Sequence, residues 1–128
     1  MNIAEEILPI HVGLVVGEPI RFEGLALVFE REPGLGRPPL VPVRGTLQEL
    51  LDNHEIGFLV LDLITAHDGL KILEKIRRTR PNLRLIVIGP VGDELVGRHA
   101  ISAGARAYHD LSDGPGEVHE ALDIVIEG

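Results

Sequence analysis

The chain has 128 residues, of which 45% are hydrophobic, and this is enough for the core of one domain of ordinary size. It has no cysteine, which excludes disulfides, thiolate zinc sites and cysteine nucleophiles. Its net charge of −8 opposes sequence-independent binding to nucleic acid, which depends on Lys and Arg neutralising phosphates. No apolar run approaches the roughly 20 residues of a membrane span, and the N-terminus is acidic where a secretory signal would be basic, so we expect a cytoplasmic protein.

The first half of the chain alternates short apolar runs with amphipathic stretches. Residues 11–16 form a near-continuous apolar run, typical of a strand buried on both faces, and Pro19 suits the first turn of a following helix. Residues 40–43 are predicted to form a second strand, which Pro42 places at the edge of a sheet. A capping-box pattern that begins at Thr46 then predicts another helix.

The second half continues the alternation. Residues 58–63 are predicted to form a third strand, in which Asp62 interrupts an otherwise apolar run. The next expected elements are a helix over about 68–79, a strand over 83–88, a helix over about 93–103 that ends at Gly104, and a strand over 105–109. A last helix is predicted from an apolar stripe at helical spacing, formed by Val118, Ala121, Leu122 and Val125.

These elements make five β–α units, the pattern of a parallel sheet covered by helices on both faces. Right-handed crossovers place the carboxyl ends of all the strands on one edge of such a sheet, and the functional crevice of α/β sheets lies at that edge. The residues expected to gather there are Gly17, Glu18, Asp62, Gly89 and Asp110.

Asp62 is the first candidate for a functional residue. A carboxylate at the end of an apolar central strand is either held by hydrogen bonds or kept for chemistry, and the residues alone leave both interpretations open.

Several segments, taken in order, resemble the response-regulator receiver family. They are residues 60–63, 68–70, 80–87 and 103–108, and the resemblance extends over residues 10 to 127. Pro19 with residues 23–25 resembles the receivers that often precede LuxR-type helix-turn-helix domains. The resemblance implies a flavodoxin-like (βα)5 three-layer sandwich with strand order 2-1-3-4-5, formed by residues 10–128 after an N-terminal extension of residues 1–9.

The resemblance also implies a function. Receivers accept a phosphoryl group from a histidine kinase on the aspartate that ends the third strand, which is Asp62 in this chain. The family holds Mg²⁺ with two acids after the first strand, and it adds a hydroxyl side chain at the end of the fourth strand and a lysine at the end of the fifth. Phosphoryl transfer needs such groups because negative charge on the phosphoryl oxygens must be neutralised.

The acids for the metal are missing from this sequence. The acidic pair falls on Val16 and Gly17, which have no side-chain oxygen, so Glu18 is the only nearby acid. A Mg²⁺ site made of Glu18 and Asp62 would therefore require a shift in register.

The other supporting groups are absent too. The hydroxyl position falls on Gly89, and residues 109–111 surround the place of the lysine with His, Asp and Leu. We therefore expect phosphotransfer to Asp62 to be inefficient.

Tyr108 matches the aromatic switch position that the family has on the fifth strand. Its ring could lie half-buried with the hydroxyl in water, or it could lie permanently inward over Gly89, where no side chain takes up space. His67 near Asp62, together with His109 beside Asp110, could also form a pH-sensitive cluster.

Three classes of function remain open. The chain could be a receiver that accepts phosphate on Asp62 and controls an output, transcription being the expected one, with DNA contacted through a separate output domain. It could instead be a phosphorylation-independent pseudo-receiver that binds a signalling protein or forms a homodimer. Third, residues 89–92 could approach an anion in a nucleotide-binding protein. No nucleophile–base pair is visible, so we do not expect an enzyme, and we expect no contact with membranes.

Overall fold

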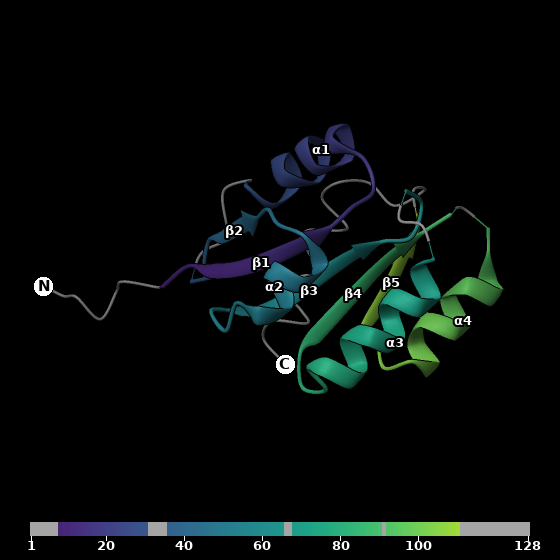
Figure 1. The fold of residues 1–128 in the computed structure, drawn as a ribbon. Coiled ribbons are helices and arrows are strands. Elements are labelled where there is room, and N and C mark those ends of the chain that lie inside the picture. The colour runs from purple at the N-terminus through teal and green to yellow at the C-terminus, as the bar shows by residue number, and fades with distance from the viewer. Residues whose placement is uncertain (1–7, 31–35, 66–67, 91, 111–128) are drawn as a thin grey trace, which may run out of the picture.

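The computed structural model describes residues 8–30, 36–65, 68–90 and 92–110. These residues form a parallel five-stranded sheet with the order β2-β1-β3-β4-β5, which confirms the predicted topology (Figure 1). The strands are β1 (Ile10–Val15), β2 (Leu40–Val43), β3 (Ile56–Asp62), β4 (Arg84–Gly89) and β5 (Ala107–Asp110). The helices are α1 (Pro19–Phe29), α2 (Leu47–Asp52), α3 (Gly69–Thr79) and α4 (Glu94–Ser102). The last predicted helix and its apolar stripe lie outside the described residues.

The described helices cover both faces of the sheet, so the molecule has three layers (Figure 1). On one face, α1 packs against alternate strand residues, such as Phe58 and Val60 of β3. On the other face, α2, α3 and α4 pack against the residues between them, such as Leu59 and Leu61. The near-continuous apolar runs in the sequence are explained by this arrangement, because a strand between two helical layers buries both of its faces.

Local signals in the sequence agree with the ends of several elements. Pro42 lies in β2, which is an edge strand as predicted. The Thr46 side chain accepts a hydrogen bond from the Glu49 amide, and the Glu49 side chain accepts one from the Thr46 amide, so the capping box is present. Gly104 follows α4 with a φ of 100°, a conformation that favours glycine.

The fifth strand begins at Ala107, two residues later than the sequence predicts. The Arg106 amide donates to the Leu85 carbonyl at 2.7 Å, so the chain first meets β4 there. Arg77 of α3 holds the preceding turn by donating to the carbonyls of Ala103 and Gly104. These contacts fix the position of β5 against the sheet.

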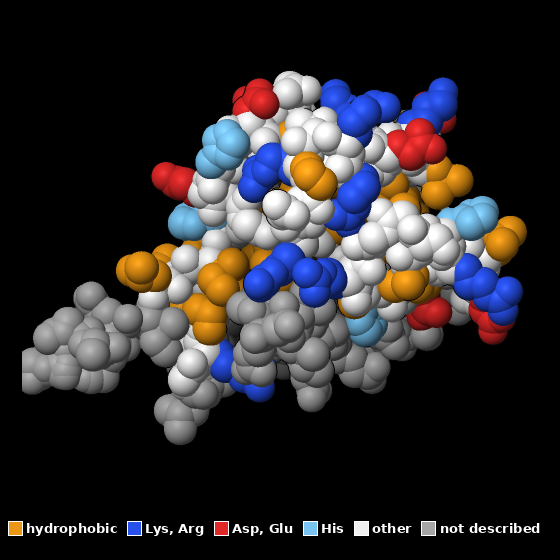
Figure 2. Space-filling model, turned by 90° about the horizontal axis from the view of Figure 1, so that it is seen from below, with side chains coloured by type: hydrophobic (Ala, Val, Ile, Leu, Met, Phe, Trp, Pro, Cys, Tyr) orange, Lys and Arg blue, Asp and Glu red, His pale blue; other side chains and the backbone are white. Residues whose placement is uncertain are grey.

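Charged and apolar side chains are mixed on the described part of the face that Figure 2 shows. Among the described residues, no helix combines the length and the apolar composition that crossing a bilayer requires.

Candidate functional site

The residues expected at the crevice follow strands that all end at the same edge of the sheet. Asp62 is the last residue of β3 and pairs in register with Ile88 of β4. Gly89 ends β4 and pairs with Asp110, which ends β5. Gly17 and Glu18 follow β1 and are exposed. The carboxyl edge of the sheet therefore carries the five positions that were expected to gather at the crevice.

Asp62 is fully buried, and it is the one charged side chain in the core of the described residues. Its two carboxylate oxygens accept four hydrogen bonds. Arg21 donates from Nε to Oδ2 at 2.9 Å and from Nη2 to Oδ1 at 3.0 Å. The Ile64 amide donates to Oδ1 at 3.2 Å, and the Thr65 hydroxyl donates to Oδ2 at 2.7 Å. A buried carboxylate needs such partners, because an unpaired buried charge is very costly.

Arg21 also belongs to the candidate site, although it was not predicted from the sequence. It lies in the first turn of α1, next to Phe22, which packs into the core. Its side chain is 24% exposed and reaches across the sheet edge to form a two-point ion pair with Asp62. Hydrogen bonding to Asp62, opposed by partial burial and aided by the charges of Asp62 and Glu18, raises the pKa of Arg21 above its ordinary value. Arg21 therefore keeps its positive charge at neutral pH.

Thr65 connects this pair to the loop after β1. Its hydroxyl oxygen accepts a hydrogen bond from the Gly17 amide at 2.9 Å while its hydrogen goes to Asp62. The Thr65 hydroxyl thereby joins the loops that follow β1 and β3, and the Asp62 carboxylate joins Thr65 to Arg21 of α1.

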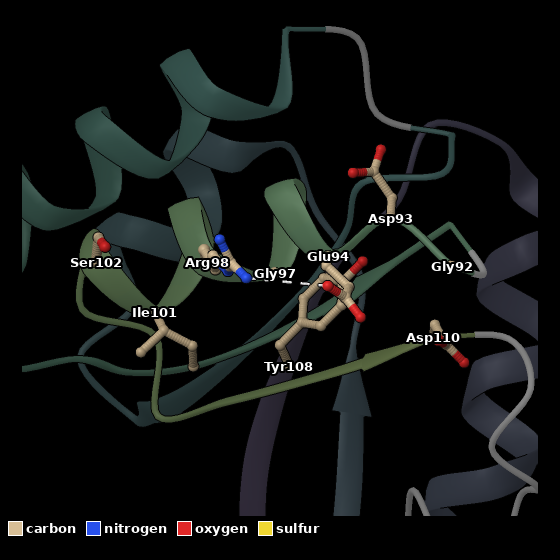
Figure 3. A pocket seen from close by; sticks show the side chains of 9 residues that line it. All are labelled: Gly92, Asp93, Glu94, Gly97, Arg98, Ile101, Ser102, Tyr108 and Asp110. Atoms are coloured by element: carbon tan, nitrogen blue, oxygen red, sulfur yellow. Dashed lines mark ion pairs between the residues drawn. The ribbon is translucent and has the colours of Figure 1, made fainter.

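Tyr108 lies half-buried on β5, on the face that α3 and α4 cover (Figure 3). Its hydroxyl lies 3.4 Å from the Pro90 carbonyl oxygen. A Cβ atom added to Gly89 would collide with the Tyr108 hydroxyl and would lie 2.7 Å from two carbons of the ring. A Cβ added to Gly97 of α4 would lie 3.0 Å from another ring carbon. The ring thus occupies a slot between two glycines, as the inward orientation requires.

The environment of Tyr108 predicts an unusual titration. Burial raises the pKa of Tyr108 above its ordinary value near 10, and the negative charges of Asp93 and Asp110 add to the effect. Stability from the neutral ring is therefore fully present below pH 10 and is lost as pH rises through the higher pKa of the folded state.

Tyr108 is the only tyrosine and the chain has no tryptophan, so phenolate absorbance reports this residue alone. We expect the folded protein to titrate above the urea-unfolded protein, and Asp93→Asn to lower the folded-state pKa. Asparagine keeps the cap that Asp93 provides for the Val96 amide. Equal pKa values in the folded and unfolded protein would contradict the inward placement.

No protein-family model and no curated protein matches the sequence, but solved structures match over almost its whole length. A response regulator from Thermotoga maritima has a TM-score of 0.77 at 18% identity, covering 94% of this chain and 100% of that one. A LuxR-family two-component response regulator from Aurantimonas sp. SI85-9A1 has a TM-score of 0.76 at 24% identity, covering 92% and 85%. A Burkholderia pseudomallei protein, provisionally described as pilus assembly-related, has a TM-score of 0.71 at 19% identity, covering 92% and 90%.

The chain has the fold of a receiver domain. At these identities the similarity concerns the fold, and the chemistry of the site must be argued from its own residues.

The residues at the crevice do not fit the Mg²⁺ that the receiver fold implies. Mg²⁺ takes oxygen ligands and is usually held by one or two carboxylates. Asp62 already binds a guanidinium with both oxygens, and Glu18 is exposed. Among the residues that the structure describes, no group of three His, Asp or Glu side chains could hold a metal ion.

Only one of the two histidines of the predicted pH-sensitive cluster lies within the described residues. His109 lies half-buried on β5 beside Asp110, while His67 lies outside the described residues. Residue 91, in the middle of the predicted anion-binding segment, lies outside them as well.

Proposed function

We propose that this chain is a receiver-type signalling module that acts through contacts with other proteins and does not need phosphorylation of Asp62. The observation that carries the proposal is the pairing of both Asp62 oxygens with Arg21. Phosphorylation requires one carboxylate oxygen to attack phosphorus in line while the bond to the donor breaks. In this chain, that attack would first require the guanidinium to leave a buried carboxylate.

The neighbouring positions support the same conclusion. Gly89 has no hydroxyl to bind a phosphoryl oxygen, and β5 ends in Asp110, whose charge would repel a phosphoryl group. The Asp62 carboxylate does have a positive charge beside it, but this charge belongs to Arg21 and is paired with the carboxylate itself. The positive charge beside Asp62 is therefore neutralised by the ion pair and does not favour the binding of a phosphoryl group.

The partner in this proposal is another signalling protein, such as a histidine kinase or a protein that controls transcription through a separate DNA-binding domain. Two of the proteins that share the fold, from Staphylococcus aureus and Silicibacter pomeroyi, are both described as LuxR-family DNA-binding response regulators.

The proposal is tested by incubating the full chain with acetyl phosphate and Mg²⁺ and measuring its intact mass after an acid quench. A receiver that is known to accept phosphate serves as the positive control. We expect no phosphoryl adduct on this chain. An adduct that disappears in Asp62→Asn would instead support the second candidate, a phosphate-accepting receiver, which the position of Asp62 at the end of β3 favours.

A further inference from the structure

The Lys and Arg residues of the chain are unevenly distributed. Residues 71–84 contain six of the 12 Lys and Arg residues and only one of the 20 Asp and Glu residues. This segment covers most of α3 and the first residue of β4. Because the whole chain has a net charge of −8, the segment is a basic region on an otherwise acidic protein.

Three of these cations form a stripe on the outer side of α3. Lys71, Lys75 and Arg78 follow one another at i, i+4 and i+7, a spacing that places side chains on one face of a helix. The opposite face packs into the core through Leu73 and Ile76, so the stripe points away from the sheet. Within the described part of the chain, the three basic side chains form no ion pair and no hydrogen bond. Their charges are therefore free to attract a ligand.

Two further arginines add positive charge near the end of α3. Arg77 donates to three backbone carbonyls, two of them in the turn after α4. Arg80 also donates to three backbone carbonyls, which lie at the end of α2 and the start of β3. Carbonyl groups have no net charge, so these bonds fix the two guanidiniums and leave their positive charge uncompensated. Glu74 is the only acidic residue of α3.

A groove of about 390 Å³ adjoins the stripe, between α3 and the turn after α4, which lie side by side (Figure 1). It is lined by Glu74, Arg77, Arg78 and Ala103. Arg77 packs closely against Gly104, because a Cβ added to Gly104 would lie 2.5 to 2.7 Å from three atoms of the guanidinium. This wall of the groove is thus held in place before any ligand arrives, which lowers the cost of binding.

The charge of the remaining chain limits what the stripe can bind. It includes 19 of the 20 acidic residues, which would repel a long nucleic acid that extends beyond α3. A second copy would bring its own net charge of −8. The stripe is seven residues of helix long, about 10 Å. A short acidic segment could cover this length without approaching the acidic parts of the surface.

We propose that α3 binds a short acidic segment of a partner protein. Its Asp or Glu carboxylates pair with Lys71, Lys75 and Arg78, which we call the α3 basic stripe. An apolar side chain of the segment contacts Leu70, which precedes the stripe and is half exposed. This inference deepens the proposed function and rests on it in one respect, namely that binding needs no phosphoryl group.

The test uses three labelled eight-residue peptides that share one leucine and have Glu, Gln or Lys at four positions, with Gly and Ser at the others. Binding to the full chain is measured by fluorescence anisotropy without Mg²⁺ or phosphodonor, and the surface is mapped from amide chemical shifts. We expect the glutamate peptide to bind tightest and the lysine peptide weakest. Added salt should weaken the glutamate peptide, because it screens exposed charges. The shifts should be concentrated on α3 and residues 103–106.

Matched variants separate the stripe from the other cations of the chain. Lys71→Gln with Arg78→Gln removes two stripe charges and is expected to weaken binding of the glutamate peptide about fivefold. Glutamine has nearly the helix propensity of lysine and arginine, so α3 should persist, which circular dichroism checks. The control, Arg44→Gln with Arg98→Gln, removes two exposed charges elsewhere and should change the affinity less than about twofold.

The apolar contact has its own pair of variants. Leu70→Ser should weaken binding of the glutamate peptide more than Leu27→Ser, which changes an exposed leucine of α1. Equal effects of these two substitutions would refute the contact with Leu70.

Several results would overturn the inference. They are no binding of the glutamate peptide, equal affinity of the three peptides, shifts centred on other elements, or equal effects of the stripe pair and the control pair. Tighter binding of a single-stranded DNA oligonucleotide or of phosphatidylserine vesicles would assign the stripe to that polyanion. Self-association that Lys71→Gln with Arg78→Gln abolishes would assign it to a second copy. An adduct on Asp62 would refute the proposed function and leave peptide binding without phosphate untouched, so the two failures can be told apart.

Discussion

Arg21→Met is expected to lower the free energy of unfolding by about 3 kcal/mol at neutral pH. Removing one partner of a buried ion pair leaves the other charge without compensation, which usually costs about 3 to 5 kcal/mol. Asp62 would keep its bonds from the Ile64 amide and the Thr65 hydroxyl, and Arg21 is partly exposed, so we expect the lower end of that range. Urea unfolding followed by circular dichroism measures the effect.

Two controls accompany this substitution. Arg98→Met removes an exposed arginine whose nearest carboxylate is 3.9 Å away, and it should cost less than about 0.5 kcal/mol. The double variant with Arg21→Met and Asp62→Leu should recover most of the lost stability, because neither charge is then left buried alone. If Arg21→Met lowers the free energy of unfolding no more than Arg98→Met does, then Arg21 does not compensate the buried charge of Asp62.

Gly89→Ala is expected to lower the free energy of unfolding by about 2 kcal/mol, within the range for overpacking a filled site. The φ of Gly89 is not positive, so alanine adds no backbone strain, and the cost comes from its collision with the Tyr108 ring. If the ring moves outward to relieve the collision, the pKa of Tyr108 should fall toward 10 and its emission should change. Thermal unfolding and absorbance titration measure the two responses.

Gly57→Ala is the matched control, because Gly57 is also a strand glycine and an added Cβ there meets nothing within 4 Å. That substitution should be neutral or slightly stabilising. On a Tyr108→Ala background, Gly89→Ala should cost little, since the ring is gone and the two sites are coupled. A full cost on that background would show that the ring is not what fills the space at Gly89.

The sheet could be predicted from the sequence because its signal is local. Apolar runs mark doubly buried strands, Pro42 marks an edge, and the pattern at Thr46 marks a helix start. Strand ends are less local: the start of β5 depends on where Arg106 first meets Leu85 of another strand, and the prediction missed it by two residues.

The position of Asp62 could be predicted, but its partner could not. The pairing joins residues 41 positions apart and depends on how α1 is rotated over the sheet edge. The rotation is set by Phe22, Leu25 and Phe29, which pack into the core. The sequence does place an arginine, Arg21, next to these apolar residues and in the first turn of a helix that begins at the crevice. Predicting its contact with Asp62 from this position would require knowing that β1 and β3 are neighbours in the sheet.

The cation that neutralises Asp62 is the guanidinium of Arg21, a part of the polypeptide itself. Its concentration beside Asp62 therefore does not vary with the metal ions in solution. Chelators and changes in free divalent cations should therefore leave the melting temperature unchanged. Under the proposed function, such a module would not sense the supply of phosphodonor in the cell, and the abundance of the module and its partner would set how much complex forms.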